Sequence, residues 1–470
     1  MRLAGRAADS AFGRVLAGAA LALCLVAPGW SLDFRQAYTL ALAADPVWAQ
    51  ARAQARADAQ QASLGRSGLL PRLDYRYARG RNWSESRQRT ALGSSTQEFD
   101  YSSYASAFTL TQPLFDAAAY ARYREGQARA RAGAYTLARA RQALAVRVLQ
   151  AYTDVLYAQD ALDLARAQER ALQEDARRSA RFVAGGEGTV TDQFEIEARL
   201  RVVQAQAIEA GDLLRAARNA LRGLTGPAWN GSTLAPLQEA GLDVLEEAPL
   251  PLARWRELAL AGNPELAAQR QLVQASHQRY LGERAGHLPS VRLYARRQLS
   301  DSNAENQIGQ RYDTSTVGVE INVPIYGGGQ TSAASAQALA QEQALQHRLQ
   351  ADTTALLDDL ERQFDTLASS RARIQAYQLA ARAAGERVRA TRRSVLGGER
   401  TSLDVLDAER QLAEARRDLA RARYDYLLAW LSLRWQAGIL AEQDVTRIAT
   451  LFGTGAPPDA PAKAAVRLPP

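Results

Sequence analysis

The chain has 470 residues, of which 47% are hydrophobic and 23% charged, and its formal net charge is +8. This composition can build a core and argues against a disordered chain. Cys24 is the only cysteine, and the three histidines, His277, His287 and His347, lie far apart in the sequence. These counts argue against a disulfide framework, a thiolate metal cluster and a histidine-based catalytic site. We therefore expect a protein that is not an enzyme and uses no cofactor.

The N-terminus has the features of an export signal. Arg2, Arg6 and Arg14 precede an apolar run over residues 15–27, and small residues follow it. The run is shorter than the about 20 residues that an ordinary transmembrane helix needs, but it suits a signal peptide. We predict a signal peptide over residues 1–31 and export across an inner membrane.

The remainder reads as two copies of one unit. Leu-Ala-Ala-Asp-Pro at 42–46 recurs as Leu-Ala-Gly-Asn-Pro at 260–264, and Gly-Gly-Glu at 185–187 recurs at 397–399. Landmarks in the same order at a nearly constant offset indicate a tandem duplication. The predicted organisation is a first repeat over 32–226, a linker over 227–250, a second repeat over 251–445, and a Pro/Ala-rich tail over 446–470.

The first repeat is predicted to run from a helix into a strand pair and then into two long helices. Leu73, Tyr75 and Tyr77 occupy every second position, which is typical of a strand. Phe108 and Leu110 likewise occupy alternate positions of the expected partner strand. The predicted elements are a helix over 34–64, strands over 71–80 and 101–112 with a polar loop over 80–100, and helices over 116–181 and 189–223.

The second repeat follows the same order. Val317, Val319 and Ile321 alternate with Gly318 and Glu320 in its clearest strand. The predicted elements are a helix over 253–285, strands over 290–297 and 314–323 with a polar loop over 298–313, and helices over 328–394 and 401–437. Four prolines are expected to stop helices and redirect the chain at the helix–strand junctions: Pro71, Pro113, Pro289 and Pro324.

Four short strands cannot close a barrel, and an exported sheet with alternating apolar residues has to close in a membrane. Two chains give eight strands and a filled interior, whereas three give twelve and leave a lumen. We therefore predict a mainly α-helical chain with a transmembrane β-barrel. Its homotrimer forms a 12-stranded barrel, to which each chain gives four strands, continued by a long α-helical coiled-coil tunnel.

The second repeat carries the most specific motif. Residues 398–408 read GERTSLDVLDA, and residues 422–427 read ARYDYL. These stretches resemble the G-x-R-T-x-x-D-V-L-D-A turn and the A-R-Y-x-Y-L segment of the TolC family of outer-membrane channel-tunnels. The resemblance implies a trimer in the lipid of the outer membrane that extends into the periplasm. It also implies partners: a periplasmic adaptor protein and an inner-membrane transporter, with the ABC type favoured.

Two aspartates near this turn are candidates for a functional site. Asp404 and Asp407 are three residues apart and therefore project from one face of a helix. The resemblance implies that they form a ring of carboxylates at the periplasmic entrance that selects cations. A local alternative is open for Asp404, because Thr401-x-x-Asp404 is a capping-box-like pattern.

Arg400 and Asp192 lie on the two predicted periplasmic turns, and the resemblance implies that they form links that hold the entrance closed. The alternatives are an exposed turn arginine and a helix cap made by Thr189 with Asp192. Val395 stands where the family often has a tyrosine that bonds across this gate. The glycines at the tips are predicted to form helix turns rather than phosphate-binding loops, because no lysine follows them and no strand precedes them: Gly185, Gly186, Gly397 and Gly398.

The favoured function is a passive export conduit for protein in type I secretion, with an RTX-type toxin as a plausible cargo. Multidrug or small-molecule efflux is the alternative within the family. A periplasmic coiled-coil adaptor is a remote alternative, and it predicts no strands. The basic charge also raises nucleic-acid binding, but the arginines alternate with acidic residues and alanine along helices, so no nucleic-acid partner is expected.

Overall fold

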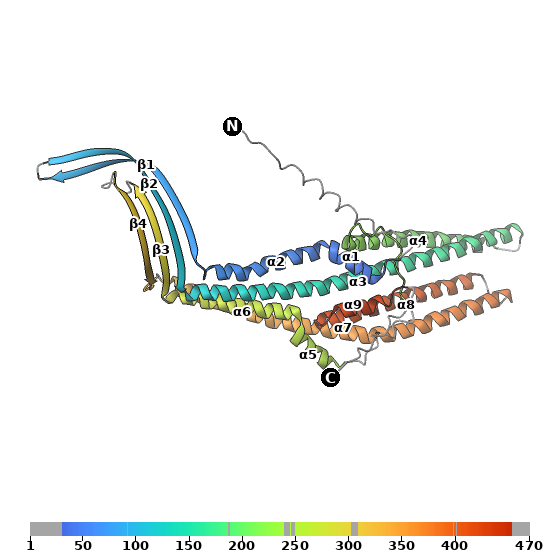
Figure 1. Ribbon diagram of the computed structural model, residues 1–470. Helices are drawn as coiled ribbons and strands as arrows, with labels where there is room; N and C mark the ends of the chain where they lie inside the picture. The colour runs from blue at the N-terminus through green and yellow to red at the C-terminus, as the bar shows by residue number, and fades with distance from the viewer. Residues whose placement is uncertain are drawn as a thin grey trace, which may run out of the picture.

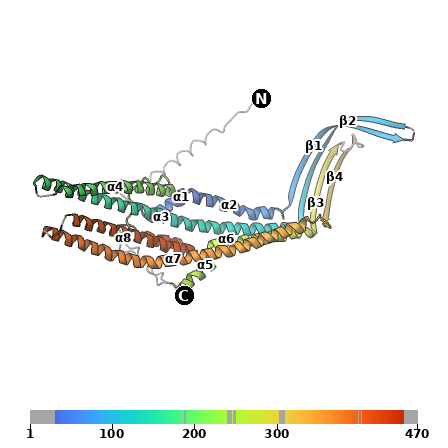
Figure 2. The same cartoon turned by 180° about the vertical axis from the view of Figure 1, so that it is seen from behind.

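The computed structural model describes residues 31–91, 93–186, 189–238, 245, 250–301, 309–397, 399–400 and 402–453. The molecule is elongated, with a β-sheet at one end and two helical tips at the other (Figure 1). Seen from behind in Figure 2, the long helices run side by side between these ends. The predicted signal peptide, apart from Ser31, lies outside the described residues.

Each repeat opens with two helices. α1 (Phe34–Ala44) and α2 (Pro46–Ser67) meet at Asp45, and α5 (Leu252–Gly262) and α6 (Pro264–Arg284) meet at Asn263. The expectation of single helices over 34–64 and 253–285 is therefore wrong. A proline lacks the N–H that continues a helix and keeps the preceding residue extended. Asp45 and Asn263 have ψ angles of 121° and 120°, and their side chains accept backbone N–H bonds at the start of the following helix.

Two long helical hairpins form the body of the molecule. The first consists of α3 (Ala117–Ala184) and α4 (Val190–Thr225), and the second of α7 (Gln330–Leu396) and α8 (Ser402–Gln436). α3 has 68 residues, so it extends about 100 Å at 1.5 Å per residue. The bounds of all four helices lie within three residues of the predicted ones. α2 and α6 pack along the ends of α3 and α7 that lead to the sheet.

The strands of both repeats form one antiparallel sheet in the order β1-β2-β3-β4. Its strands are β1 (Arg72–Thr90), β2 (Gly93–Phe115), β3 (Ser290–Asp301) and β4 (Arg311–Asn322). β2 of the first repeat pairs directly with β3 of the second. β1 and β4 are the edge strands, so each has one unpaired side in the single chain.

The first two strands are much longer than predicted. The expectation of a polar loop over 80–100 is wrong, because most of this stretch continues the β1–β2 hairpin beyond β3 and β4 (Figure 1). Cross-strand polar pairs occur in this part, such as Arg81 with Asp100 at 2.7 Å. Polar side chains occupy both of its faces, so the alternation that identifies a half-buried strand is missing. Parts of the second predicted loop, 298–301 and 311–313, are also strand, and residues 302–308 lie outside the described residues.

The two faces of the sheet differ in chemistry, because successive side chains of a strand point to opposite sides. Leu73, Leu110, Ala295 and Val317 lie in one row across the four strands. The next row, on the opposite face, is polar and consists of Asp74, Thr109, Arg296 and Thr316. Leu73 and Val317 are 67% and 75% exposed in the single chain, so the apolar face is available to lipid.

The junction prolines do not all lie between elements. Pro71 and Pro289 each come directly before a strand, and Pro324 follows β4. Pro113 instead lies inside β2, where the pairing with β3 shifts register between Pro113 and Phe115. Its expected place at a helix–strand junction is therefore wrong, since a strand accommodates proline at such an irregularity.

The main core lies midway along the helices, where α1, α3, α4, α8 and α9 (Glu442–Ala449) meet. Phe34, Tyr152 and Phe452 pack there, with ring centroids of Tyr152 and Phe452 5.0 Å apart. The Tyr152 hydroxyl lies 2.8 Å from the carbonyl oxygen of Leu32. Residues 446–453, expected to begin the tail, instead contribute Ile448 and Phe452 to this core. So short a stretch contains too few apolar positions for its periodicity to indicate a core segment.

One acid in the tunnel helices, partly shielded from water where it meets α8, predicts a pH dependence. The Tyr424 hydroxyl of α8 donates to Asp160 of α3 at 2.8 Å, and burial is the main cause that raises the pKa of the Asp160 carboxyl. A carboxyl whose pKa is higher in the folded state costs stability as pH rises from its ordinary value of about 3.9 through the folded value. Asp160→Asn, which keeps the acceptor oxygen for Tyr424, is expected to flatten the pH dependence of thermal unfolding just above that pH. Asp154→Asn, an exposed change on the same helix, is the control and should leave the profile unchanged.

Candidate functional site: the helical tips

The first tip joins α3 to α4 through a glycine turn. Gly185 ends α3 with a backbone bond to Arg181, and Gly186 has a φ of +79°, a conformation that glycine adopts without strain. The Thr189 hydroxyl oxygen accepts a bond from the backbone N–H of Asp192 at 3.1 Å. The local cap is thus present. It leaves the exposed Asp192 carboxylate in the first turn of α4, where the helix dipole favours a negative charge.

The second tip joins α7 to α8. α7 ends at Leu396, and Gly397 caps it in ordinary right-handed geometry with a φ of −84°. Gly398 and Thr401 lie outside the described residues, so the turn role of Gly398 and the capping alternative for Asp404 stay hypotheses. Asp404 lies in the first turn of α8.

The structure does not join Arg400 to Asp192 within one chain. Both residues are exposed, and neither forms an ion pair with a described residue of its own chain. They belong to different tips, which end separately in Figure 1. We therefore expect any link between them to join neighbouring chains.

A small apolar cluster behind the tips joins the two hairpins. Leu172 of α3, Ile196 of α4 and Leu406 of α8 are 7%, 3% and 6% exposed. Leu406 is the residue before Asp407, so this contact sets where the acidic face of α8 lies relative to α4.

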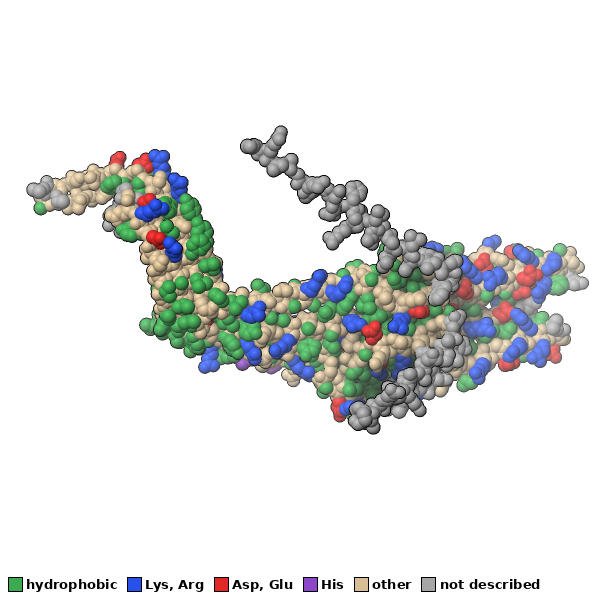
Figure 3. Space-filling view, in the orientation of Figure 1, with side chains coloured by type: hydrophobic (Ala, Val, Ile, Leu, Met, Phe, Trp, Pro, Cys, Tyr) green, Lys and Arg blue, Asp and Glu red, His purple; other side chains and the backbone are tan. Residues whose placement is uncertain are grey.

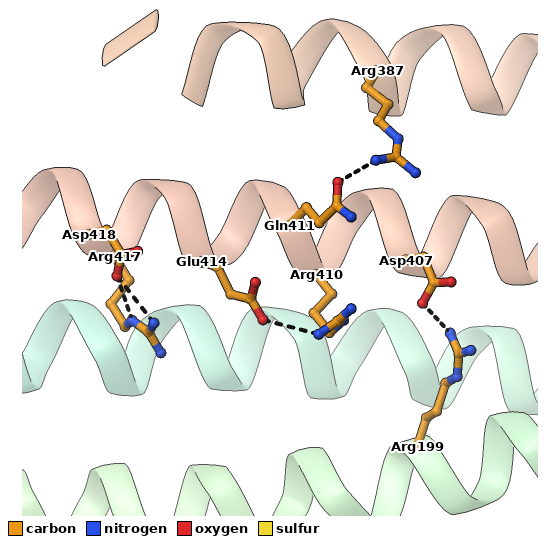
Figure 4. A network of polar contacts seen from close by, with 8 residues as sticks. All are labelled: Arg199, Arg387, Asp407, Arg410, Gln411, Glu414, Arg417 and Asp418. Atoms are coloured by element: carbon orange, nitrogen blue, oxygen red, sulfur yellow. Dashed lines mark hydrogen bonds and ion pairs between the residues drawn. The ribbon is translucent and has the colours of Figure 1, made fainter. Parts of the chain in front are cut away.

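Asp407 is already paired in the single chain. Arg199 of α4 donates from Nη1 to Asp407 Oδ1 at 2.9 Å (Figure 4). Its Nη2 donates to Glu195 Oε1 at 2.6 Å. Sequence reasoning placed Asp407 on the correct helix but missed Arg199, which lies 208 residues away. No local spacing connects two residues on different repeats.

A groove with a volume of about 1300 Å³ runs between α3, α4 and α8, and Arg199 and Asp407 are among the residues that line it. Apolar side chains such as Val202 and Leu213 share its walls with charged ones such as Arg417. On α8, Arg410 pairs with Glu414 at 3.3 Å, and Arg417 pairs with Asp418 at 3.1 Å (Figure 4). Figure 3 shows basic and acidic side chains interspersed along both hairpins rather than collected in one basic patch.

Among the described residues, none of the helices is long and apolar enough to cross a membrane, and no cluster of three or more His, Cys, Asp or Glu residues is arranged to hold a metal ion.

Comparison with known proteins identifies the family. The profile of the outer membrane efflux protein family matches residues 37–227 and 255–438, one segment in each repeat. This chain belongs to that family. The predicted resemblance to TolC-type outer-membrane channels is thereby confirmed.

Two relatives match the channel over nearly their whole length. The alkaline protease secretion protein AprF of Pseudomonas aeruginosa is 40% identical over 439 residues, covering 93% of this chain and 91% of AprF. The proteases secretion protein PrtF of Dickeya chrysanthemi is 41% identical over 427 residues, covering 90% of this chain and 91% of PrtF. The solved CmeC outer membrane channel of Campylobacter jejuni shares the fold, with a TM-score of 0.75 and 14% identity over 90% of each chain.

The family and the fold together place the channel in the outer membrane, with its helices extending into the periplasm. The four-stranded sheet contradicts the remote alternative of a coiled-coil adaptor, which predicted no strands.

Proposed function

We propose that this channel is the outer-membrane component of a type I secretion system and that its cargo is a secreted protease. The observation that carries the proposal is the identity of about two residues in five with two protease secretion proteins, AprF and PrtF, over nine tenths of the chain. The RTX-type toxin considered above remains a hypothesis, and the names of these relatives favour a protease as cargo.

We further propose that the working form is a homotrimer. A single chain leaves the outer sides of β1 and β4 unpaired, and an open sheet edge is not viable in hydrocarbon. Pairing β4 of one chain with β1 of the next closes a barrel of twelve strands in three chains, wide enough for a lumen. The row of Leu73, Leu110, Ala295 and Val317 then faces lipid, and the row that contains Arg296 faces the lumen.

In this assembly the helical tips meet at the periplasmic entrance. We infer that Asp404 and Asp407 line the entrance and that Arg400 reaches Asp192 of a neighbouring chain to hold it closed. The partners are a periplasmic adaptor and an inner-membrane transporter of the ABC type. Energy for export comes from the transporter, and the channel supplies the path.

The function is tested by complementation. Full-length chain expressed in a Pseudomonas aeruginosa strain that lacks AprF, together with the remaining secretion components, is expected to restore alkaline protease to the culture medium. Extracellular proteolysis on casein plates measures this directly. A second variant, Asp404→Asn with Asp407→Asn, is expressed in the same strain. It tests whether the entrance carboxylates matter for cargo passage.

Small-molecule efflux is the competing function, because the family model that matches this chain is described as outer membrane efflux protein. The two are separated by measuring susceptibility to several antibiotics in the organism's own deletion strain. Loss of extracellular protease with unchanged susceptibility supports secretion. Hypersensitivity with normal protease export would contradict it.

A further inference from the structure

The ion pair between Arg199 and Asp407 has consequences for the charge of the entrance. Asp407 belongs to the acidic pair that the proposed function places around the entrance, yet its carboxylate is bound to a guanidinium of its own chain at 2.9 Å. A carboxylate that shares its charge with an arginine attracts a passing cation less than an isolated one does.

The ion pair is an oriented contact between α4 and α8. Arg199 is the more buried partner, with 31% of its side chain exposed, against 45% for Asp407. Glu195, one turn earlier on α4, holds the second Nη of Arg199 at 2.6 Å. The guanidinium is thus oriented from its own helix before it reaches α8. Close by, Leu172, Ile196 and Leu406 bring α4 and α8 together.

Neighbouring charges on α8 are arranged differently. The nearby cations Arg410 and Arg417 pair with acids of α8 itself, as Figure 4 shows. The α7–α8 hairpin is held by its own contact between Arg392 and Glu409 at 2.5 Å. Arg199 with Asp407 instead joins the first hairpin to the second, so a movement of one hairpin against the other stretches this pair.

We propose that Arg199 is a charge-setting latch of the channel entrance. In the resting channel it ties α8 to α4 and offsets part of the charge of Asp407, because Glu195 shares the same guanidinium. When the hairpins separate, the latch parts, and each chain adds one free carboxylate to the entrance. Opening and cation attraction are thereby coupled in one element, in the way that local ion pairs bias other two-state elements. This inference rests on the proposed entrance, but not on the identity of the cargo.

The test is made on purified full-length trimers in planar bilayers, with Mg²⁺ added on the side of the helical tips. Arg199→Gln is expected to lower the Mg²⁺ concentration that blocks half of the current by about three- to tenfold, because a ring of carboxylates loses its counter-charges. The reversal potential in a KCl gradient should shift toward cation selectivity. Arg199→Lys keeps a positive charge and should stay close to the unmodified channel.

Arg201→Gln is the matched control. Arg201 lies two residues along α4, is exposed and bonds to Gln204 rather than to an acid. The substitution removes the same net charge without freeing a carboxylate, so the block should not change. If Arg201→Gln and Arg199→Gln lower the blocking concentration equally, the effect is one of net charge and the latch is wrong.

Asp407→Asn provides a second test of the proposal, and the single variant can be measured even if Arg199→Gln does not fold. Asp407→Asn alone removes one negative charge per chain while Arg199 stays paired with Glu195, so it should weaken the Mg²⁺ block. Combined with Arg199→Gln, it should bring the block back close to that of the unmodified channel. An unchanged block in Asp407→Asn alone, or a combined variant that is blocked as strongly as Arg199→Gln, would overturn the proposal. Failure of the unmodified chain to restore protease secretion would refute the proposed cargo but leave these bilayer results able to decide the latch.

Discussion

Replacing Arg400 and Asp192 together by alanine is expected to raise the single-channel conductance several-fold in planar bilayers. Both side chains are exposed at the two tips and lack an ion pair with a described residue of their own chain. In the proposed trimer we expect each tip to lie beside the tip of a neighbour, so that three equivalent contacts hold the entrance closed. Removing all of them shifts the equilibrium between closed and open forms toward open. We expect Val395, in place of the family's tyrosine, to leave closure more dependent on Arg400.

The ionic strength provides a sharper version of this experiment. Exposed charges are screened within about 3 Å at 1 M salt but within about 10 Å at 0.1 M. The difference in normalised conductance between the unmodified and double-alanine channels should therefore shrink as salt rises. Arg181→Ala, which removes an exposed arginine from the end of α3, is the control for net charge at the tip. An unchanged conductance in the double variant at low salt would refute the gate.

Gly438→Ala is expected to destabilise the chain by about 2–5 kcal/mol, combining overpacking with a left-handed backbone. Gly438 has a φ of +76°, and a Cβ there would lie 2.4 Å from the Cα of Asn263. The site joins three elements, because Gln142 of α3 donates to the Gly438 carbonyl at 3.0 Å and Asn263 donates to the Gln436 carbonyl at 2.7 Å. A shift at Gly438 therefore disturbs the α5–α6 junction and the end of α8 together.

The measurement is the temperature at which heat-resistant trimers dissociate on a denaturing gel, together with the yield of trimer in outer-membrane fractions. Gly223→Ala is the matched control, because Gly223 lies inside α4 and a Cβ there would meet no atom within 4 Å. Alanine is the better helix former, by about 1 kcal/mol, so the control should be as stable as the unmodified chain or more so. Equal trimer stability for both variants would contradict the packing described at Gly438.

The long helices were predictable from the sequence because their signal is local and repeated many times. α3 and α7 contain no internal proline, and an apolar position every three or four residues over some 18 turns leaves no competing pattern. The two short helices that open each repeat, α1 with α2 and α5 with α6, were predicted as single helices. Pro46 and Pro264 stop the preceding helix and start the next, and one intervening residue leaves no loop to recognise.

The sheet was predictable only where one face is apolar. Val317, Val319 and Ile321 revealed β4 by alternation, whereas the distal β1–β2 hairpin is polar on both faces and read as a loop. The residues of the proposed entrance were also only partly predictable. Asp404 and Asp407 could be proposed from their spacing on one helix and from a family motif, but Arg199 could not, because the pair it forms exists only after two repeats have packed together.

The sequence by itself determined the duplicated plan, the alternation of tunnel helices with barrel strands, and the acidic face of α8, because each depends on periodicity or spacing within a few turns of chain. Only the tertiary structure decided which strands from the two repeats adjoin, where the terminal residues enter the core, and which charges at the tips compensate one another. Those properties depend on contacts between residues that are about 200 positions or more apart, and no local pattern encodes the partner.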